Sequence, residues 1–513
     1  MPDVDDTLEN ARAKIDAEIL ALQQRIRVLC SSRNALSLIH RLPIETMAEI
    51  FKWVQILYHG TLGLDGGNSA SLPKWMQVTH VSQHWRNTAL SSKALYSTIL
   101  SQNPKYSEEI FKRSGSARLT LIDSVGARAG RAWDTPDFRG LVVAALPRVR
   151  KLCLHPKSSG FIFPLLKTSR LSLEELCLYD WNDFAPTMFP TSLRYLQLWS
   201  CSFESFQWLS PLSNMVELTI ITTSHVKPIS VDALLNALDA MPRLISLRLS
   251  ILCKLAATPV NRGSPITPKL QHLDIRDHPD FIVQFLPWLS FAPRFTMNIF
   301  VHALSYSAAD SLSMTFEKVG LHLLASSMVL HTAHFIWTPS NSSIAADISC
   351  FEEAQDKPCF RLHHQIRKEK DILRTWLEGA KVLPIGDVES LIMNAPCDVV
   401  DWSDGPWRSL PKLRQLVLHN KQASSTLIKY LIATADETDT PFESLEELSL
   451  YDVEYGRNLK SKFHAVLTGR MEKLGIKLRK LAFHNCGIYR GSMEQLFDVV
   501  DEVEVHGGTV RKR

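Results

Sequence analysis

Histidines and cysteines stand close together at a few places where their spacing could support metal chemistry. His80 and His84 are four residues apart, which would place both imidazoles on one face of a helix, as in many zinc sites. No third ligand follows nearby, so we interpret the pair as ordinary helix residues. A second group combines ligand-type side chains at a spacing that matches no known zinc site: Cys350, Cys359, His363 and His364. We expect no metal site.

Cys153 and Cys177 fall at equivalent positions of successive apolar segments, so their thiols would lie side by side in neighbouring strands. Such a pair could serve redox chemistry or could simply pack, and we favour packing. The nine cysteines are odd in number and scattered, and they include no Cys-x-x-Cys pair. Reduced thiols are therefore expected rather than a disulfide framework.

Enzyme motifs are missing from the sequence. It contains no G-x-S-x-G, no G-x-x-x-x-G-K-[ST], no H-E-x-x-H and no G-x-G-x-x-G. We therefore expect a protein that is not an enzyme, with no catalytic residue and no cofactor.

Composition narrows the classes of partner. The 513 residues are 45% hydrophobic and 21% charged, as in ordinary globular proteins of two or more domains. A net charge of +4 over this length is too dilute to favour nucleic acid. No apolar run reaches the length of a membrane span, and the N-terminus is acidic where a secretory signal would be basic. We expect no membrane association and a cytoplasmic or nuclear location, or both.

Residues 1–36 predict one amphipathic helix of the coiled-coil type. Apolar residues recur in a heptad pattern without Gly or Pro from residue 7 to residue 38, although Arg12 and Arg33 interrupt the pattern at its two ends. Such a helix can dimerise or bind a partner helix, or it can fold against its own chain. The heptad residues are Leu8, Ile15, Ile19, Leu22, Ile26, Leu29 and Leu36.

Residues 37–100 predict three short helices. Pro43 suits a first helical turn, since its missing N–H is not needed there. Sixty residues of this kind bury too little core alone, so some apolar residues should be exposed for an interface. The three apolar stripes comprise Ile44, Met47, Ile50, Phe51 and Val54, then Val78, Val81, Trp85 and Leu90, then Leu95, Tyr96 and Ile99.

The segments "LPIETMAEIF", "VTHVSQHWRNTAL" and "LYSTI" together resemble an F-box. The departures are a longer loop from Gly60 to Lys74 and Met47 where Leu is commoner. The resemblance implies docking onto a Skp-family adaptor and, through it, onto a cullin in an SCF ubiquitin ligase. The adaptor-binding residues that it implies are Leu42, Pro43, Ile44, Met47, Ile50, Phe51, Val81 and Trp85.

The rest of the chain repeats. Eleven copies of hydrophobic-x-x-hydrophobic-x-hydrophobic begin at residues 149, 173, 193, 215, 244, 270, 388, 413, 445, 478 and 500. Their spacing resembles that of leucine-rich repeats, in which each copy is one short strand. We expect an α/β fold in which residues 146–510 form an irregular leucine-rich-repeat solenoid. Residues 101–145 should supply a connecting helix and a first irregular repeat.

The region from about 300 to 385 fits the repeat poorly. "SSMVLHTAHFIWT" and "KPCFRLHHQ" are interpreted as degenerate strands, and "KDILRTWLEGAKVLP" as a repeat helix. Between the two strands, "PSNSSIAADISCFEEAQD" is interpreted as a polar insertion. An insertion of this kind can lie at a binding surface or can be a tolerated surface loop.

One column of residues follows the last apolar position of each copy and should face away from the buried leucines. Within and beside it, the candidates for gripping a protein substrate are Tyr179, Tyr195, Trp199 and Arg276, because aromatic and Arg side chains often anchor interfaces. These rings could equally be covered by another segment. The full column is His155, Tyr179, Trp199, Ile221, Ser250, Arg276, Asn394, His419, Tyr451, His484 and His506.

The order of N-terminal helix, F-box-like unit and irregular repeats resembles the large F-box families of fungi. This resemblance implies a substrate-receptor subunit of an SCF-type ubiquitin ligase, with an unknown protein as substrate. The alternative is a non-enzymatic leucine-rich-repeat scaffold that forms a homodimer through its N-terminal helix.

Overall fold

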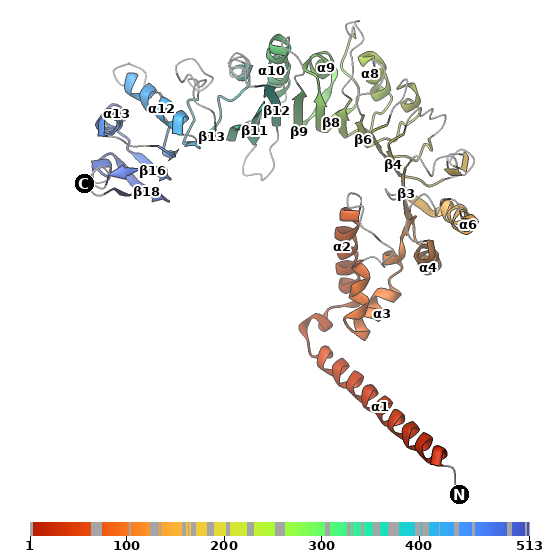
Figure 1. Ribbon diagram of the computed structural model, residues 1–513. Coiled ribbons are helices and arrows are strands. Elements are labelled where there is room, and N and C mark those ends of the chain that lie inside the picture. The colour runs from red at the N-terminus through yellow and green to blue at the C-terminus, as the bar shows by residue number, and fades with distance from the viewer. Residues whose placement is uncertain are drawn as a thin grey trace. The chain divides into compact units, whose positions relative to one another are not determined.

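The protein is a mixed α/β chain with an N-terminal helix and a large, mostly parallel sheet (Figure 1). Its structure is a computed structural model that divides into two compact units, residues 1–180 with 188–193, and residues 181–187 with 194–513. The residues that it describes are 4–62, 74–101, 104–123, 133, 135–155, 161–162, 164–165, 171–181, 189–201, 206–222, 230–251, 262–302, 308–325, 330, 332–339, 343–351, 360–367, 379–394, 402, 410–419, 421–434, 441–453, 457–489, 495–507 and 510–511.

The first unit begins with helix α1 (Val4–Ala35), which confirms the predicted N-terminal helix. A helical module follows over residues 38–96. Its elements are η1 (Leu38–Arg41), α2 (Ile44–Leu62), η2 (Lys74–His80), α3 (Gln83–Ser91) and η3 (Lys93–Tyr96).

The module differs from three simple helices at two points. The predicted second helix is divided, because the Ser82 hydroxyl accepts a hydrogen bond from the Trp85 N–H and so caps α3 at its N-terminus. The predicted third helix is only the 3-10 turn η3, and Ile99 lies beyond it in strand β1 (Thr98–Leu100).

Four parallel strands complete the first unit. β1 pairs with β2 (Leu119–Ile122), β2 with β3 (Val149–Leu154), and β3 with β4 (Glu175–Tyr179). Helix α4 (Pro104–Ser114) precedes β2, as predicted, while α6 (Pro136–Ala145) and η4 (Leu146–Arg148) precede β3.

A buried carboxylate joins the strand ends of this unit. Asp123 is 3% exposed and accepts hydrogen bonds from Ser101 Oγ at 2.7 Å and from Trp133 Nε1 at 2.9 Å. Its second oxygen accepts a bond from the backbone N–H of His155 at 3.3 Å. Because its oxygens are satisfied by partners on three segments, Asp123 is expected to hold these segments together.

Strands of the second unit pair in the order β5–β6–β7–β8–β9–β12–β11–β10–β13–β14–β15–β16–β18. The bounds before the irregular region are β5 (Tyr195–Trp199), β6 (Glu217–Ile221), β7 (Ser246–Ser250), β8 (Lys269–Asp277) and β9 (Ser290–His302). Those after it are β13 (Ser390–Asn394), β14 (Gln415–Leu418), β15 (Glu447–Tyr451), β16 (Leu478–His484) and β18 (Val500–His506). All eleven predicted copies form strands, counting β3 and β4 of the first unit.

The irregular region adds three strands to the same sheet. They are β10 (Thr332–Pro339), β11 (Ser343–Phe351) and β12 (Phe360–Arg367), with antiparallel pairing of β10 to β11 and of β11 to β12. The two degenerate strands are thus confirmed. The prediction of a polar insertion was wrong for residues 343–351, which form strand β11. This stretch pairs with β10 and β12, and a local sequence pattern does not reveal such pairing. Most of the helix predicted at 370–384 lies outside the described residues.

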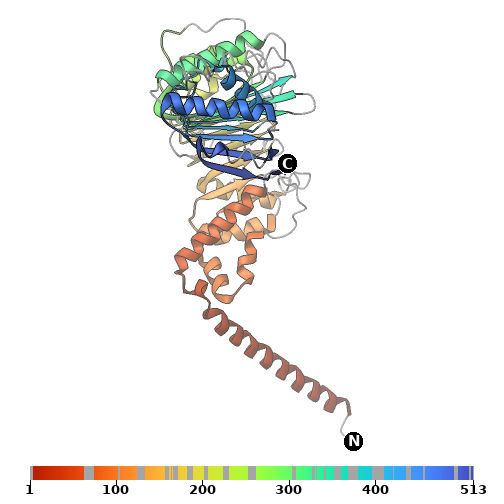
Figure 2. The ribbon, with the colours of Figure 1, turned by 90° about the vertical axis from the view of Figure 1, so that its left-hand side faces the viewer.

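Helices cover one face of the second unit's sheet (Figure 1). Seen from the side, the helix at the C-terminal end lies over strands of the same colour (Figure 2). These helices are α8 (Val231–Asp239), α9 (Pro279–Phe285), α10 (Ala308–Ala325), α12 (Lys421–Ala433) and α13 (Arg457–Leu474), with the short turns η6 (Gln207–Leu209) and η7 (Leu286–Trp288). A separate small pair joins β17 (Ile488–Tyr489) to β19 (Val510–Arg511).

Several strands, among them β5, β13, β14 and β15, bury every second residue. In β15, for example, Leu448 and Leu450 are buried, whereas Glu447, Ser449 and Tyr451 are only partly buried. Four strands are followed directly by a non-glycine residue with φ near +55°: Asp180, Ser200, Asp452 and Asn485. Short polar side chains tolerate this left-handed conformation best, so the same turn recurs with the same kind of residue.

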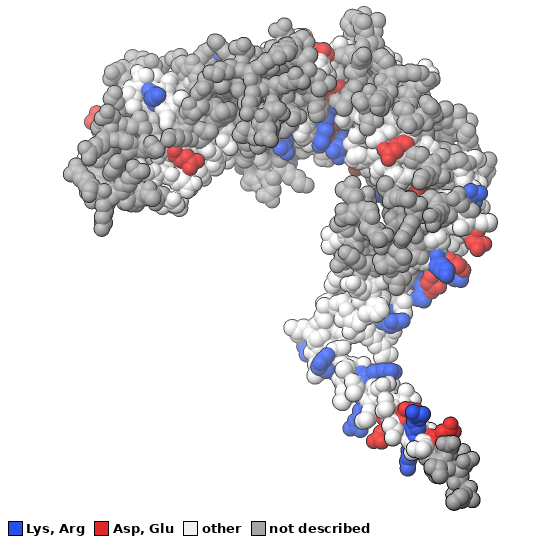
Figure 3. All heavy atoms as spheres, viewed as in Figure 1, with Lys and Arg blue, Asp and Glu red and all other residues white. Residues whose placement is uncertain are grey.

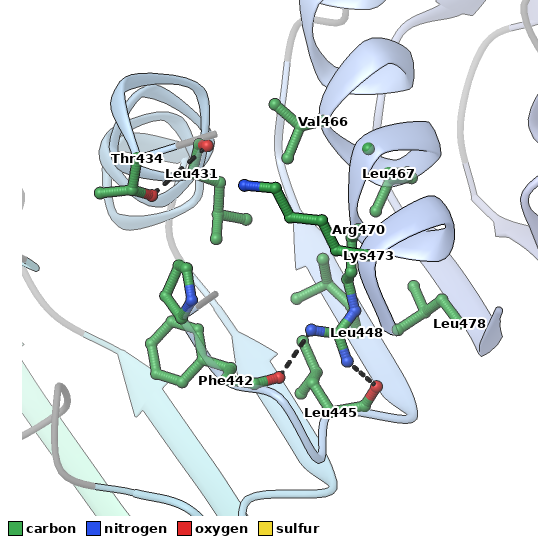
Figure 4. A pocket seen from close by; sticks show the side chains of 12 residues that line it. Leu431, Thr434, Phe442, Leu445, Leu448, Val466, Leu467, Arg470, Lys473 and Leu478 are labelled. Carbon is green, nitrogen blue, oxygen red and sulfur yellow. Dashed lines mark hydrogen bonds between the residues drawn. The ribbon is translucent and has the colours of Figure 1, made fainter. Parts of the chain in front are cut away.

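A small apolar pocket lies between α12 and α13 (Figure 4). Arg470 closes its floor by donating hydrogen bonds to the backbone oxygens of Phe442, Glu443 and Leu445 at 2.7, 2.8 and 2.9 Å. Burial lowers the pKa of Arg470. Because the guanidinium is engaged with backbone carbonyls, we interpret Arg470 as a structural brace for the turn at Phe442 and not as a ligand-binding group.

Two helical glycines give a matched test of the packing. A Cβ at Gly320 in α10 would lie 2.5 Å from the backbone oxygen of Val382, whereas one at Gly140 in α6 would meet nothing within 4 Å. We expect Gly320→Ala to lower the free energy of unfolding by about 1–3 kcal/mol through overpacking. Gly140→Ala should raise it by about 0.5–1 kcal/mol, because alanine favours the helix. Urea unfolding followed by circular dichroism measures both changes in the free energy of unfolding. Equal changes for the two variants would contradict the close approach of α10 to the backbone at Val382.

Candidate functional site

The exposed face of the sheet carries the predicted column of residues at the ends of its strands. The register aligns Trp199 with Ile221 and Ser250, and Tyr451 with His484 and His506. Most of these side chains are exposed or half-buried, while Ser250 is buried. The column is therefore a surface of the sheet, formed by residues far apart in sequence.

At the C-terminal end of the sheet, the column becomes a stack of rings. His419 and Tyr451 have ring centroids 4.2 Å apart, Tyr451 and His484 4.1 Å, and His484 and His506 4.7 Å. Parallel strands set this spacing, since neighbouring strands lie about 4.8 Å apart. We call His419, Tyr451, His484 and His506 the ring stack.

Electrostatics make the ring stack sensitive to protonation. Burial lowers the pKa of His484, and the neighbouring His506 and His419 lower it further. Burial also lowers the pKa of His419, against an opposing effect of Asp452. At the edge of the stack, His506 Nε2 lies 2.9 Å from Glu504, which also pairs with Lys480 at 2.8 Å. Lys480 and His506 lower the pKa of Glu504 to about 2.

A second cluster on the exposed face of β5 to β9 joins two of the predicted substrate-binding residues. The Arg248 guanidinium lies 5.7 Å from the Trp199 ring and pairs with Asp274 at 3.4 Å. Asp274 also pairs with Arg276 at 3.2 Å, and Arg276 lies 4.2 Å from the Phe300 ring. We call Trp199, Arg248, Asp274, Arg276 and Phe300 the cation–aromatic cluster.

The other two predicted residues take part in different ring contacts. Tyr195 is half-buried on β5, on the same strand face as Trp199, with the Arg194 guanidinium 5.8 Å from its ring. Tyr179 belongs to the first unit, where it stacks on His155 at 4.7 Å. Sequence reasoning missed Arg248 and Phe300, although both could have been found by extending the face alternation back along β7 and onto β9.

Cys153 and Cys177 are cross-strand neighbours in β3 and β4, as predicted, and both are buried. Their mutual hydrogen bond, followed by burial, raises the pKa of Cys153, and the same hydrogen bond lowers the pKa of Cys177. Because both thiols are buried, the geometry fits a packing role.

The predicted adaptor-binding residues of the helical module fall into two groups, one buried or half-buried in its core and one accessible at its surface. Met47 and Phe51 are each 1% exposed and fill the module's core, where the Phe51 ring lies 5.2 Å from that of half-buried Trp85. These residues would support an interface from beneath. The accessible group consists of Leu42, Pro43, Ile44, Ile50 and Val81, with Leu42 half-buried and the others exposed.

Sequence reasoning missed an apolar surface on the outer face of α2. Trp53, Ile56 and Leu57 are 59%, 48% and 69% exposed, and Ile50 lies on the same side at 40%. The opposite face is packed, and its Gln55 donates a hydrogen bond to the Leu95 backbone oxygen at 2.9 Å. The sequence signal for this surface was the spacing of Ile50, Trp53 and Leu57, which are three, four and seven residues apart and so share one face of a helix. A surface helix that is apolar on both faces indicates a binding surface.

Metal and membrane sites find no support within the described ranges. Those ranges contain no group of three or more His, Cys, Asp or Glu side chains fit to hold a metal. His84 instead packs near His40, with ring centroids 5.2 Å apart. Cys359 and the side chains of His363 and His364 lie outside the described residues. Among the described residues, no helix is long and apolar enough to cross a membrane.

Comparison with known proteins adds no family assignment. The chain matches no family model and no curated protein sequence.

The ring stack predicts a pH dependence of stability. His419 and His484 have lowered pKa values in the folded state, so the unfolded chain binds protons more strongly between those values and about 6.5. The contribution of these two histidines to the free energy of unfolding should therefore be fully present above about pH 6.5, and it should be lost as the pH is lowered. Urea unfolding between pH 7.5 and 5 should give a flatter profile for the double variant His419→Asn, His484→Asn.

The matched control for this measurement is His80→Asn, since His80 is exposed in the helical module. Its pH profile should follow that of the parent. A double variant whose profile also follows the parent would show that the ring stack does not set the dependence.

Proposed function

We propose that this protein is a substrate receptor of an SCF-type ubiquitin ligase. The observation that carries the proposal is the accessible apolar surface of the helical module, beside a core already filled by Met47, Phe51 and Tyr96. Exposed apolar side chains that do not belong to the core of the module are best explained by binding to a protein partner.

The Skp-family adaptor is the partner that fits this surface best. The accessible residues Leu42, Pro43, Ile44, Ile50 and Val81 belong to the segments that resemble an F-box, and Trp53 and Leu57 enlarge the surface. Large aromatic and aliphatic side chains of this kind are the usual anchors of protein interfaces. Glu45 and Glu49, also exposed, would lie at the polar rim.

The remainder of the chain is proposed to be an irregular leucine-rich-repeat solenoid. Supporting features are the strands at all eleven predicted copies, their in-register parallel pairing and the recurring left-handed residue that follows four of them. Repeats of this kind present one continuous exposed strand face, which serves as a binding surface.

The cation–aromatic cluster is our candidate for the substrate-binding surface. Trp199, Arg276 and Phe300 supply rings and a guanidinium, while Asp274 supplies an acceptor. Such a mixed surface favours a protein segment that offers both apolar and polar groups. The chain would supply proximity and orientation only, because ubiquitin transfer in such complexes belongs to other subunits.

Adaptor binding tests the proposal directly. The purified chain should capture a Skp-family adaptor in a pull-down, and the double variant Leu42→Ala, Pro43→Ala should lose most of this binding. Truncating interface anchors typically costs about 1–3 kcal/mol, which corresponds to roughly a tenfold to hundredfold loss of affinity.

Two control variants make this test specific. Ile476→Ala truncates an apolar side chain that is 60% exposed in the second unit and should leave adaptor binding unchanged. Trp199→Ala should also leave it unchanged, because Trp199 belongs to the proposed substrate surface. A folded parent chain that captures no adaptor would refute the receptor function.

A further inference from the structure

Helix α1 carries an apolar stripe that the other described residues of the first unit leave exposed. Leu8, Ile15, Leu22 and Leu29 are 64%, 59%, 55% and 62% exposed, and Ile19 and Ile26 are 47% and 59% exposed. Within the described part of the first unit, α1 therefore does not fold its stripe against its own chain. A stripe of this regularity is suited to another helix.

The heptad positions identify the contact face of that stripe. With Leu8, Ile15, Leu22 and Leu29 at the d positions, the a positions are Arg12, Ile19, Ile26 and Arg33. The two central a positions are thus apolar, whereas the a position nearest each end of the stripe is an arginine. Leu20 and Val28 lie at outer positions, away from this face.

The arginines distinguish between the two possible orientations of a second copy. In a parallel pair, residues at a positions face their own equivalents, so Arg12 would face Arg12 and Arg33 would face Arg33. In an antiparallel pair, a positions face d positions: Ile19 meets Leu22, Ile26 meets Ile15, and Arg12 meets Leu29. The antiparallel pair avoids both like-charge layers, and each arginine can extend past its leucine to solvent.

Charge along α1 favours the same orientation. Residues 4–21 contain five acidic and two basic side chains, whereas residues 22–35 contain three basic and no acidic ones. Figure 3 shows the acidic atoms of α1 in red over its N-terminal half and basic atoms in blue toward its other end. An antiparallel pair places the acidic half of one helix beside the basic half of the other.

One flanking pair follows from this alignment. Glu18 of one helix and Arg25 of the other lie within two residues of the same level, which is about 3 Å along the axis. In a parallel pair, Glu18 would instead lie beside Gln23, and Arg25 beside Cys30.

We propose that α1 binds α1 of a second copy of this chain as an antiparallel coiled coil. The 32-residue helix is about 48 Å long. Because each helical module follows the C-terminal end of its own α1, the two modules would lie at opposite ends of the coiled coil. The proposal concerns a surface separate from that of the adaptor and does not depend on the proposed function.

Self-association of the full chain is the first measurement. Sedimentation equilibrium should give a dimer for the parent and for Leu20→Asp, and a monomer for Leu22→Asp at micromolar concentration. Leu20 and Leu22 are 65% and 55% exposed, so the two substitutions are matched in chemistry and accessibility. Circular dichroism should confirm an unchanged unfolding midpoint of the main body. A monomeric parent, or equal behaviour of the two variants, overturns the proposal.

Cross-linking then establishes the orientation. In a Cys30→Ser background, Leu8→Cys mixed with Arg33→Cys should form a disulfide-linked pair on mild oxidation, because residues 8 and 33 face each other across an antiparallel dimer. Leu8→Cys alone should not cross-link, since its two copies would be about 37 Å apart. The Cys30→Ser chain without an introduced cysteine is the control. Cross-linking of Leu8→Cys alone would show a parallel pair and overturn the proposed geometry.

Charge reversal provides an independent test of orientation. Glu18→Arg and Arg25→Glu should each raise the dimer dissociation constant by roughly tenfold, and the double reversal should restore it. Failure of the double reversal to restore association would contradict the antiparallel register. Adaptor binding measured on the same variants should stay unchanged, which separates failure of this proposal from failure of the receptor function.

Discussion

Parallel pairing of short strands is the constraint on which most of the structure depends. A strand of five residues, such as β15, has too few contacts to be stable alone, and it needs neighbours for both its hydrogen bonds and its buried leucines. In-register pairing then forces alternate residues into rows. Leu448 lies beside Leu481 in the buried layer, and Tyr451 lies beside His484 on the exposed face. The same pairing that builds the core thus determines which exposed side chains meet.

Rows on the exposed face differ in chemistry along the strands. Near the strand starts, Glu389, Arg414, Glu446 and Arg479 alternate in charge, with N–O distances of 3.8–4.0 Å. Such exposed pairs contribute little each, but opposite charges on adjacent strands support the register. Near the strand ends, rings and guanidinium groups dominate. Because the charges largely neutralise one another, recognition on this face is expected to depend on shape and aromatic contact more than on net charge.

The sequence predicts the parts that depend on local periodicity. All eleven strands and the exposed column followed from alternation within six residues, and α1 followed from its heptads. Prediction from the sequence failed where the structure depends on pairing between distant segments or on burial. Residues 343–351 look polar but form β11 between two partners, and Met47 is buried although the family pattern placed it at an interface. The cation–aromatic cluster also depends on strands that lie far apart in sequence, so only its Trp199 and Arg276 were identified.

The exposed apolar residues of the N-terminal segment have a physical cost that bears on function. Isolated helices gain little stability in water, and an uncovered stripe of leucines promotes association. The stripe of α1 and the outer face of α2 belong to different helices, with η1 between them. A partner on one face therefore leaves the other available within the same chain. The proposed self-association and the proposed adaptor docking are then compatible, and each would cover apolar surface that is exposed among the described residues of the first unit.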